Sequence, residues 1–194
     1  MAYYYLLAQL PGLSYGQAAP MKSRDFRELA AYNLGAADAA WLDLCTLNPV
    51  VGAACAAGKG TPEFFRRWQE YERALRLNLA RYRAAKTRRD APPDTPEHPA
   101  DAAAAAKAAA ALDSPLEAEI FLDEARWKAI EYFQGITYFD RNTVYAYLLK
   151  LLLMERRSSF RAEEGFAEYK GLYAAVMEGY SGGAGLNSQS GEPK

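Results

Sequence analysis

The stretch from Val144 to Met154 constrains the fold most, because every residue in it except Lys150 is apolar or aromatic. A helix built from such a run is apolar on nearly all of its sides and needs neighbours around its whole circumference. We therefore predict that this segment belongs to the central helix of the fold.

A membrane span is the main alternative for this run. A span needs about 20 consecutive apolar residues, whereas this run is shorter, contains Lys150 and is followed by Glu155, Arg156 and Arg157. Burial within the protein explains the run better. Lys150 is then expected to reach the surface or to pair with an acid such as Glu131, in preference to acting as a reactive or partner-binding amine.

Capping signals predict where other helices begin. Ser114, Pro115 and Glu117 have the spacing of a capping box with proline at the first helical position. Ser23 and Thr61 are predicted to be N-caps in the same way. Further helices are predicted over residues 36–47 and over a C-terminal segment whose apolar residues keep helical spacing: Phe166, Tyr169, Tyr173, Val176 and Tyr180.

A long helix is predicted from about residue 62 to about residue 89. Its inward stripe has helical spacing and consists of Phe64, Trp68, Tyr71, Leu75, Leu79 and Tyr82. The opposite face is basic and has no acidic residue between positions 73 and 89; its members are Arg73, Arg76, Arg81, Arg83, Lys86, Arg88 and Arg89.

Three interpretations of this basic face remain open. It could be a solvated or internally paired surface, a binding site for an acidic protein partner, or a nucleic-acid-binding surface, since arginine neutralises phosphates. Nucleic acid is disfavoured, because no aromatic residues alternate with the arginines on the exposed face of the helix and the rest of the chain is net acidic.

The composition indicates one helical domain. A chain of 194 residues with 51% hydrophobic content can build a core without disulfides. We predict an all-α fold, a bundle of five or six helices spanning residues 1–180. The apolar segment at residues 3–10 is expected to be buried; spacing leaves strand and helix open, and we take it as a short N-terminal extended arm.

Two segments are expected to lie outside this bundle. Four prolines within residues 91–99 and the alanine-rich stretch that follows predict a mobile insert at about 91–112 with little side chain to pack. The polar, glycine-rich and serine-rich residues 181–194 predict a disordered tail. Cys45 and Cys55 lie in apolar surroundings and no leader pattern precedes them, so a reducing cytoplasm is expected.

The sequence offers few candidates for catalysis, and we expect no catalytic, cofactor or metal site. His98 is the only histidine, so nitrogen-rich metal sites and Ser/His or Cys/His nucleophiles lack their base. Gly58 and Lys59 do not follow the spacing of a phosphate-binding loop. Glu119 and Asp123, one turn apart, could form a hydrolase pair in a deep polar cleft, but a helix N-terminus favours their ionised forms.

Three stretches together resemble a bacterial family of unknown function found alongside V-type ATPase subunits. They are the opening Tyr3-Tyr4-Tyr5-Leu6-Leu7-Ala8-Gln9-Leu10-Pro11-Gly12-Leu13, the helix from Ser114-Pro115-Leu116-Glu117 to Trp127, and Tyr138-Phe139-Asp140 through Ala146-Tyr147-Leu148-Leu149-Lys150-Leu151 to Glu155-Arg156. The same elements are similar to the C (or d) subunit of V/A-type rotary ATPases, a helical cup that joins the central shaft to the membrane ring.

The resemblance implies a non-catalytic subunit or accessory factor that assembles or couples a rotary ATPase through contacts with its protein subunits. Any association with the membrane would then be indirect, through the complex. The chain is much shorter than a three-lobed C subunit, so it would correspond to part of that cup at most. No functional residue is carried over, and the basic face becomes the candidate surface for an acidic shaft or stator subunit.

Overall fold

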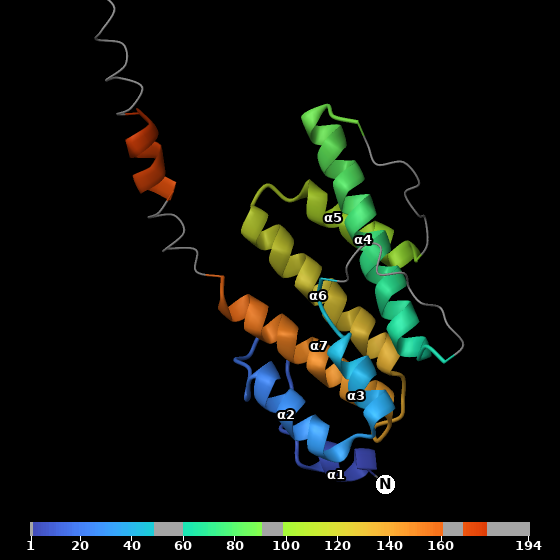
Figure 1. Ribbon diagram of the computed structural model, residues 1–194. Coiled ribbons are helices and arrows are strands. Elements are labelled where there is room, and N and C mark those ends of the chain that lie inside the picture. The colour runs from blue at the N-terminus through green and yellow to red at the C-terminus, as the bar shows by residue number, and fades with distance from the viewer. Residues whose placement is uncertain (1, 49–59, 91–98, 161–168, 178–194) are drawn as a thin grey trace, which may run out of the picture. The chain divides into compact units, whose positions relative to one another are not determined.

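The computed structural model describes residues 2–48, 60–90, 99–160 and 169–177, and these residues form helices and no strand. The all-α prediction is therefore confirmed. The chain divides into two compact units, Met1–Ser159 and Phe160–Lys194. Seven helices, α1 to α7, occupy the described part of the first unit, where five or six were expected for the whole bundle (Figure 1).

Helix α7, Arg141–Ser158, is the centre of the first unit, as predicted (Figure 1). It packs against α1, α2, α3, α4 and α6, which surround it along its length. Its buried side chains come from all sides of the helix: Val144, Tyr145, Ala146, Leu148, Leu149, Leu151, Leu153 and Met154. Among the described helices, none combines the length and the apolar character that a membrane span requires.

Helices α4 (Glu63–Thr87), α5 (Ala100–Ala111) and α6 (Pro115–Gln134) pack against one another. The inward stripe of α4 is confirmed, with Phe64, Trp68, Tyr71, Leu75 and Leu79 all buried and Tyr82 half-buried. Helices α6 and α4 cover one side of α7, with α6 in the more extensive contact, and α5 packs on α4 and α6 (Figure 1).

Helix α5 corrects one expectation for the alanine-rich segment. Ala102, Ala105, Ala106 and Ala109 recur at helical spacing and are buried, mainly against α4. Methyl side chains are small enough for two helices to approach closely, so the segment packs well without large residues. Residues 91–98, the proline-rich part of the predicted insert and the site of His98, lie outside the described residues.

The other side of α7 is covered by α1 (Ala2–Ala8), α2 (Ser23–Asn33) and α3 (Ala36–Asp43). The expectation of an extended N-terminal arm is wrong, because residues 2–8 are helical. Helical geometry sends only Leu6 fully into the core and leaves Tyr4 and Tyr5 exposed. The hydroxyl of Tyr3 donates a hydrogen bond to Asp38 and so fastens α1 to α3.

The predicted caps give mixed results. Ser114 is confirmed, since its Oγ accepts a hydrogen bond from the backbone N–H of Glu117 at 3.3 Å. Ser23 is the first residue of α2 and caps nothing; its N–H and hydroxyl instead bond Glu155 of α7. Helix α4 begins after Pro62, which takes the cap position predicted for Thr61.

In the second unit, residues 169–177 are helical, as the spacing predicts. Tyr169, Tyr173 and Val176 are exposed there. Phe166, Tyr180 and the predicted tail at 181–194 lie outside the described residues.

Candidate functional site

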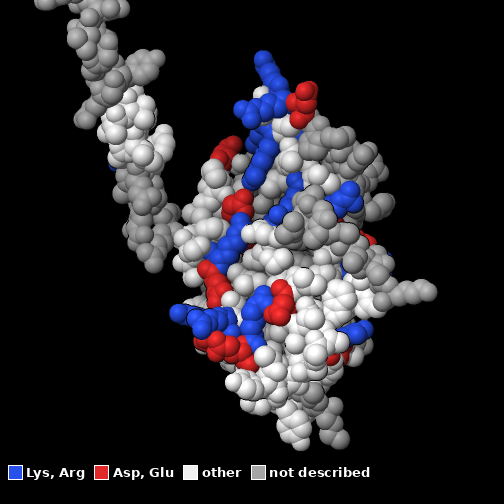
Figure 2. Space-filling model, viewed as in Figure 1, with Lys and Arg blue, Asp and Glu red and all other residues white. Residues whose placement is uncertain are grey.

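The predicted basic face of α4 separates into two groups in the structure. Arg83 points towards Glu119 of α6, Arg76 bonds Glu72 of α4 and the segment after α3, and both belong to a charged network. The remaining members are exposed, and within the described ranges none of them lies in an ion pair: Arg73, Arg81, Lys86, Arg88 and Arg89. Figure 2 shows basic side chains, with an acidic one beside them, at the upper end of the first unit, where α4 ends in the same view of Figure 1.

The chain leaves α4 at Arg88 in a left-handed conformation, with φ 53° and ψ 39°. A residue with this conformation commonly terminates a helix, since the following N–H groups can turn back to the last carbonyls. Here the N–H of Arg89 donates to the carbonyl of Ala84 at 3.0 Å. This turn presents Arg88 and Arg89 together at the end of the helix.

The second group belongs to a chain of ion pairs that joins α4, α6 and α7. Glu72 is fully buried and accepts hydrogen bonds from Arg126 Nε at 2.5 Å and from Arg76 Nε at 3.0 Å. Arg126 Nη1 also donates to Asp123 Oδ1 at 2.9 Å. Buried charges of this kind are tolerated only when they are paired and hydrogen-bonded.

The network continues outwards through Arg156 and Glu119. Arg156 donates to Asp123 Oδ1 at 3.2 Å and to Glu119 Oε2 at 2.6 Å. Glu119 Oε1 accepts from Arg83 Nη2 at 3.3 Å. Four guanidinium groups therefore alternate with three carboxylates, which leaves one positive charge in excess.

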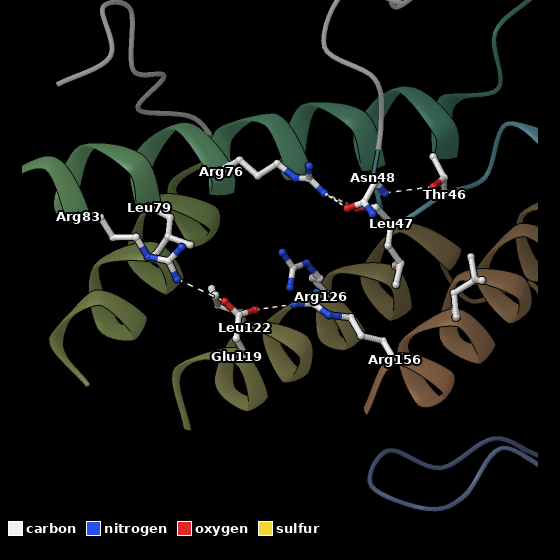
Figure 3. Close-up of a pocket in the computed structure, with 11 residues that line it drawn as sticks. Thr46, Leu47, Asn48, Arg76, Leu79, Arg83, Glu119, Leu122, Arg126 and Arg156 are labelled. Carbon is white, nitrogen blue, oxygen red and sulfur yellow. Dashed lines mark hydrogen bonds and ion pairs between the residues drawn. The ribbon is translucent and has the colours of Figure 1, made fainter. Parts of the chain in front are cut away.

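These arginines line a pocket of about 570 Å³ between the three helices and the segment that follows α3. Figure 3 shows Arg76 and Arg83 entering from α4, Glu119 and Arg126 from α6, and Arg156 from α7. The full lining is Thr46, Leu47, Asn48, Arg76, Leu79, Arg83, Glu119, Leu122, Arg126, Leu152 and Arg156. The pocket thus combines a strongly basic wall with leucine side chains.

Burial changes the titration of the two innermost groups. It raises the pKa of the Asp123 carboxyl above its ordinary value, despite the opposing effect of Arg156 and Arg126. One oxygen of this carboxyl, Oδ2, is buried without a hydrogen-bond partner among the described residues. Burial acts to lower the pKa of Arg126, but Glu72 and Asp123 outweigh it and the pKa is raised, so Arg126 keeps its positive charge.

The carboxylate pair considered for a hydrolase lies in this network. Glu119 lines the polar pocket, whereas Asp123 is buried behind it, two turns into α6. Burial raises the pKa of Asp123, which is opposite in direction to the effect expected from a helix N-terminus. Both oxygens of Glu119 already accept hydrogen bonds from arginines. The two carboxylates are arranged to orient guanidinium groups.

Lys150 forms the expected ion pair with Glu131. Its Nζ lies 3.2 Å from Glu131 Oε1 and 5.1 Å from the centre of the Trp127 ring, which in turn donates its indole N–H to Glu131. Cys45 is buried as a free thiol, and burial raises its pKa to about 12. Cys55, Gly58 and Lys59 lie outside the described residues.

Metal ligands do not gather in the described part of the chain. Within it, His, Cys, Asp and Glu side chains form no group of three that could hold a metal ion. The carboxylates of the pocket network are instead bonded to guanidinium groups.

Sequence reasoning missed Glu72, Arg126 and Arg156 as members of a common site. The signal available was local: Arg76 follows Glu72 by four residues, and Arg126 follows Asp123 by three, both spacings that favour ion pairs on a helix. The links between helices have no such signal, because the two members of the Glu72 and Arg126 pair are 54 residues apart.

The chain matches no protein-family model, no curated protein and no solved structure.

Proposed function

We propose that this protein is a non-catalytic helical subunit or accessory factor of a V-type rotary ATPase, and that it binds an acidic partner subunit through the end of α4. The surface in question consists of Arg81, Lys86, Arg88 and Arg89, which we call the α4 basic end. The proposal places the protein in the cytoplasm, at the membrane only through the complex.

The observation that carries the proposal is the exposure of the α4 basic end. All four side chains face solvent, and none is neutralised by an ion pair among the described residues. Basic residues that are not consumed by internal pairs can attract a complementary acidic surface, which raises association rates and selects partners. The resemblance to a family that accompanies V-type ATPases supplies the class of partner.

Figure 2 is consistent with a surface of this kind, because basic side chains run down the viewed face from the end of α4, with acidic ones among them both there and lower down. Arg83 is paired with Glu119, and the exposed Asp90 follows Arg89 directly. The α4 basic end still carries four basic residues and is where the partner is proposed to bind.

The test is co-purification of the tagged full chain with ATPase subunits from its native cell. The variant Arg81→Glu, Arg88→Glu, Arg89→Glu reverses three charges that have no internal partner among the described residues. The control Lys22→Glu, Lys107→Glu, Lys128→Glu makes the same change in net charge at exposed positions outside α4, and the ion pair of Lys128 with Glu124 that it breaks is exposed and contributes little to stability. We expect loss of co-purification for the first variant only, with unchanged helicity by circular dichroism; retention in both would refute the proposal.

A nucleic-acid partner would give a different result in the same material. Binding to phosphates falls steeply with salt, so labelled RNA should then be retarded at low salt and near about 150 mM salt, and less by the triple variant. RNA binding without ATPase co-purification would replace the proposed function with this alternative.

A further inference from the structure

The pocket between α4, α6 and α7 is lined by Arg126, whose guanidinium group has hydrogen-bond donors that the ion-pair network leaves unbonded. The side chain of Arg126 is almost fully buried, with 6% of its surface exposed, and it lines the pocket wall. Its Nε and Nη1 bond Glu72 and Asp123. Its Nη2 has no acceptor among the described residues, although it is not sealed from the pocket.

Two further guanidinium groups have N–H donors to spare at the same wall. Arg76 uses Nε and Nη2, on Glu72, the carbonyl of Leu47 and Asn48, and its Nη1 bonds no described residue. Arg83 bonds Glu119 through Nη2 only. Carboxylates bond each of these groups, and all three arginines line the pocket, from two helices (Figure 3).

The charge and donor geometry select the ligand. An arginine fork matches carboxylate and phosphate oxygens, and hydrogen bonds between charged groups are about twice as strong as neutral ones. Donors from two arginines of α4 and one arginine of α6 suit a tetrahedral dianion better than a planar, singly charged carboxylate. The net excess of one positive charge in the network disfavours a cation.

The size of the pocket and its apolar wall indicate that the ligand is larger than a free anion. A volume of about 570 Å³ falls within the usual range for small-molecule sites, roughly 300–1,000 Å³. Leu79, Leu122 and Leu152 supply apolar surface beside the arginines. A phosphoryl group on a small organic body would use both walls.

We propose that this pocket binds a phosphorylated small molecule, whose phosphoryl oxygens accept hydrogen bonds from Arg76, Arg83 and Arg126. Glu72, Asp123 and Glu119 act as positioning residues that hold these arginines. The site is separate from the α4 basic end, so it can be tested without affecting the proposed partner surface.

The experiment is isothermal titration calorimetry of the full chain with inorganic phosphate and pyrophosphate, at about 50 mM salt. Arg83→Gln is the main variant, because its side chain is 56% exposed and its loss should not unfold the protein. Arg66→Gln, on the same helix and 50% exposed, is the matched control. Binding is expected for the wild type and the control, with a loss of about tenfold or more for Arg83→Gln and a larger loss for Arg76→Gln, Arg83→Gln.

A second set of probes distinguishes the source of the phosphate. Co-sedimentation with phosphatidic acid vesicles, but not phosphatidylcholine vesicles, that is weakened by Arg83→Gln and not by Arg66→Gln would assign the site to a lipid headgroup. Phosphate binding without such sedimentation would assign it to a soluble phosphate compound. The proposal is overturned if none of these probes binds, if acetate binds as tightly as phosphate, or if Arg83→Gln binds like the control.

Discussion

Glu72 of α4 and Arg126 of α6 meet inside the protein, with Glu72 Oε1 2.5 Å from Arg126 Nε and both side chains almost fully removed from solvent. Neither charge could be buried alone at reasonable cost. The pair therefore fixes the relative position of two helices, and it holds the arginine around which the pocket is built.

The first prediction concerns this pair. Glu72→Gln removes the charge that compensates Arg126 and also one partner of Arg76, while Asp123 remains. Breaking a buried pair from one side costs about 3–5 kcal/mol, so we expect the midpoint of thermal unfolding to fall by roughly 6–20 °C. Differential scanning calorimetry of the full chain measures this.

Two controls separate burial from charge. Glu28→Gln breaks the ion pair between Arg24 and Glu28, whose side chains are 86% and 62% exposed, and should cost at most about 0.5 kcal/mol. The double change Glu72→Leu, Arg126→Met removes both charges and should be less harmful than Glu72→Gln alone. Equal effects of Glu72→Gln and Glu28→Gln would show that the internal pair is not needed.

Cys45 should be inert in the folded protein. Burial raises the pKa of its thiol to about 12, and the thiolate is the reactive form. At about pH 8 we expect iodoacetamide to modify Cys45 only after denaturation, as measured by mass spectrometry of the peptide that contains it. Rapid native labelling at this residue would contradict its burial.

Stability should decline at high pH because of half-buried tyrosines. Burial raises the pKa of Tyr3 and of Tyr147 to about 12, whereas phenols of the unfolded chain ionise near about 10. Between these values the unfolded chain releases protons that the folded chain keeps, so the free energy of unfolding falls as the pH rises. It should be unaffected by these groups below about pH 9.

The variant Tyr147→Phe tests the assignment. It loses the hydrogen bond to the carbonyl of Pro11, which should cost about 1 kcal/mol at neutral pH. Because phenylalanine has no ionisable group, the decline of stability with pH should become shallower. Chemical denaturation at a series of pH values gives both quantities; an unchanged slope would remove Tyr147 from the explanation.

Glu155 should stabilise the start of α2. Its carboxylate accepts hydrogen bonds from the N–H of Ser23 at 2.7 Å and from the Ser23 hydroxyl at 2.6 Å. We expect Glu155→Ala to cost about 1–2 kcal/mol and to speed hydrogen exchange in the first turn of α2. Ser23→Ala removes only the hydroxyl bond and should cost less; additivity of the two changes would argue against direct coupling.

Much of the fold was predictable from periodicity. The central helix at α7, the buried stripe of α4 and the Ser114 cap all follow from local spacing, which the structure confirms. The N-terminal helix was not predictable in the same way, because seven residues are too few for spacing to separate helix from strand. Its contact with α3 through Tyr3 and Asp38 is tertiary.

The pocket was less predictable than the fold. Arg76 and Arg83 were recognised as basic residues, and Arg76 pairs with Glu72 of its own helix, but only the packing of α4 against α6 brings Arg83 to Glu119. From the sequence, Asp123 could not be distinguished from the other acidic residues near the start of its helix. In the structure it lies on the buried face of α6 and forms ion pairs with two arginines.

The alanines of α5 have a consequence for how this chain can vary. Where methyl groups alone separate two backbones, any larger side chain must push the helices apart, so Ala102 and Ala106, both fully enclosed, admit almost no replacement. Their outward neighbours Ala104 and Ala108 carry no such restriction. Helix α5, although it is almost entirely alanine, should therefore tolerate few substitutions on its buried face and many on its exposed face.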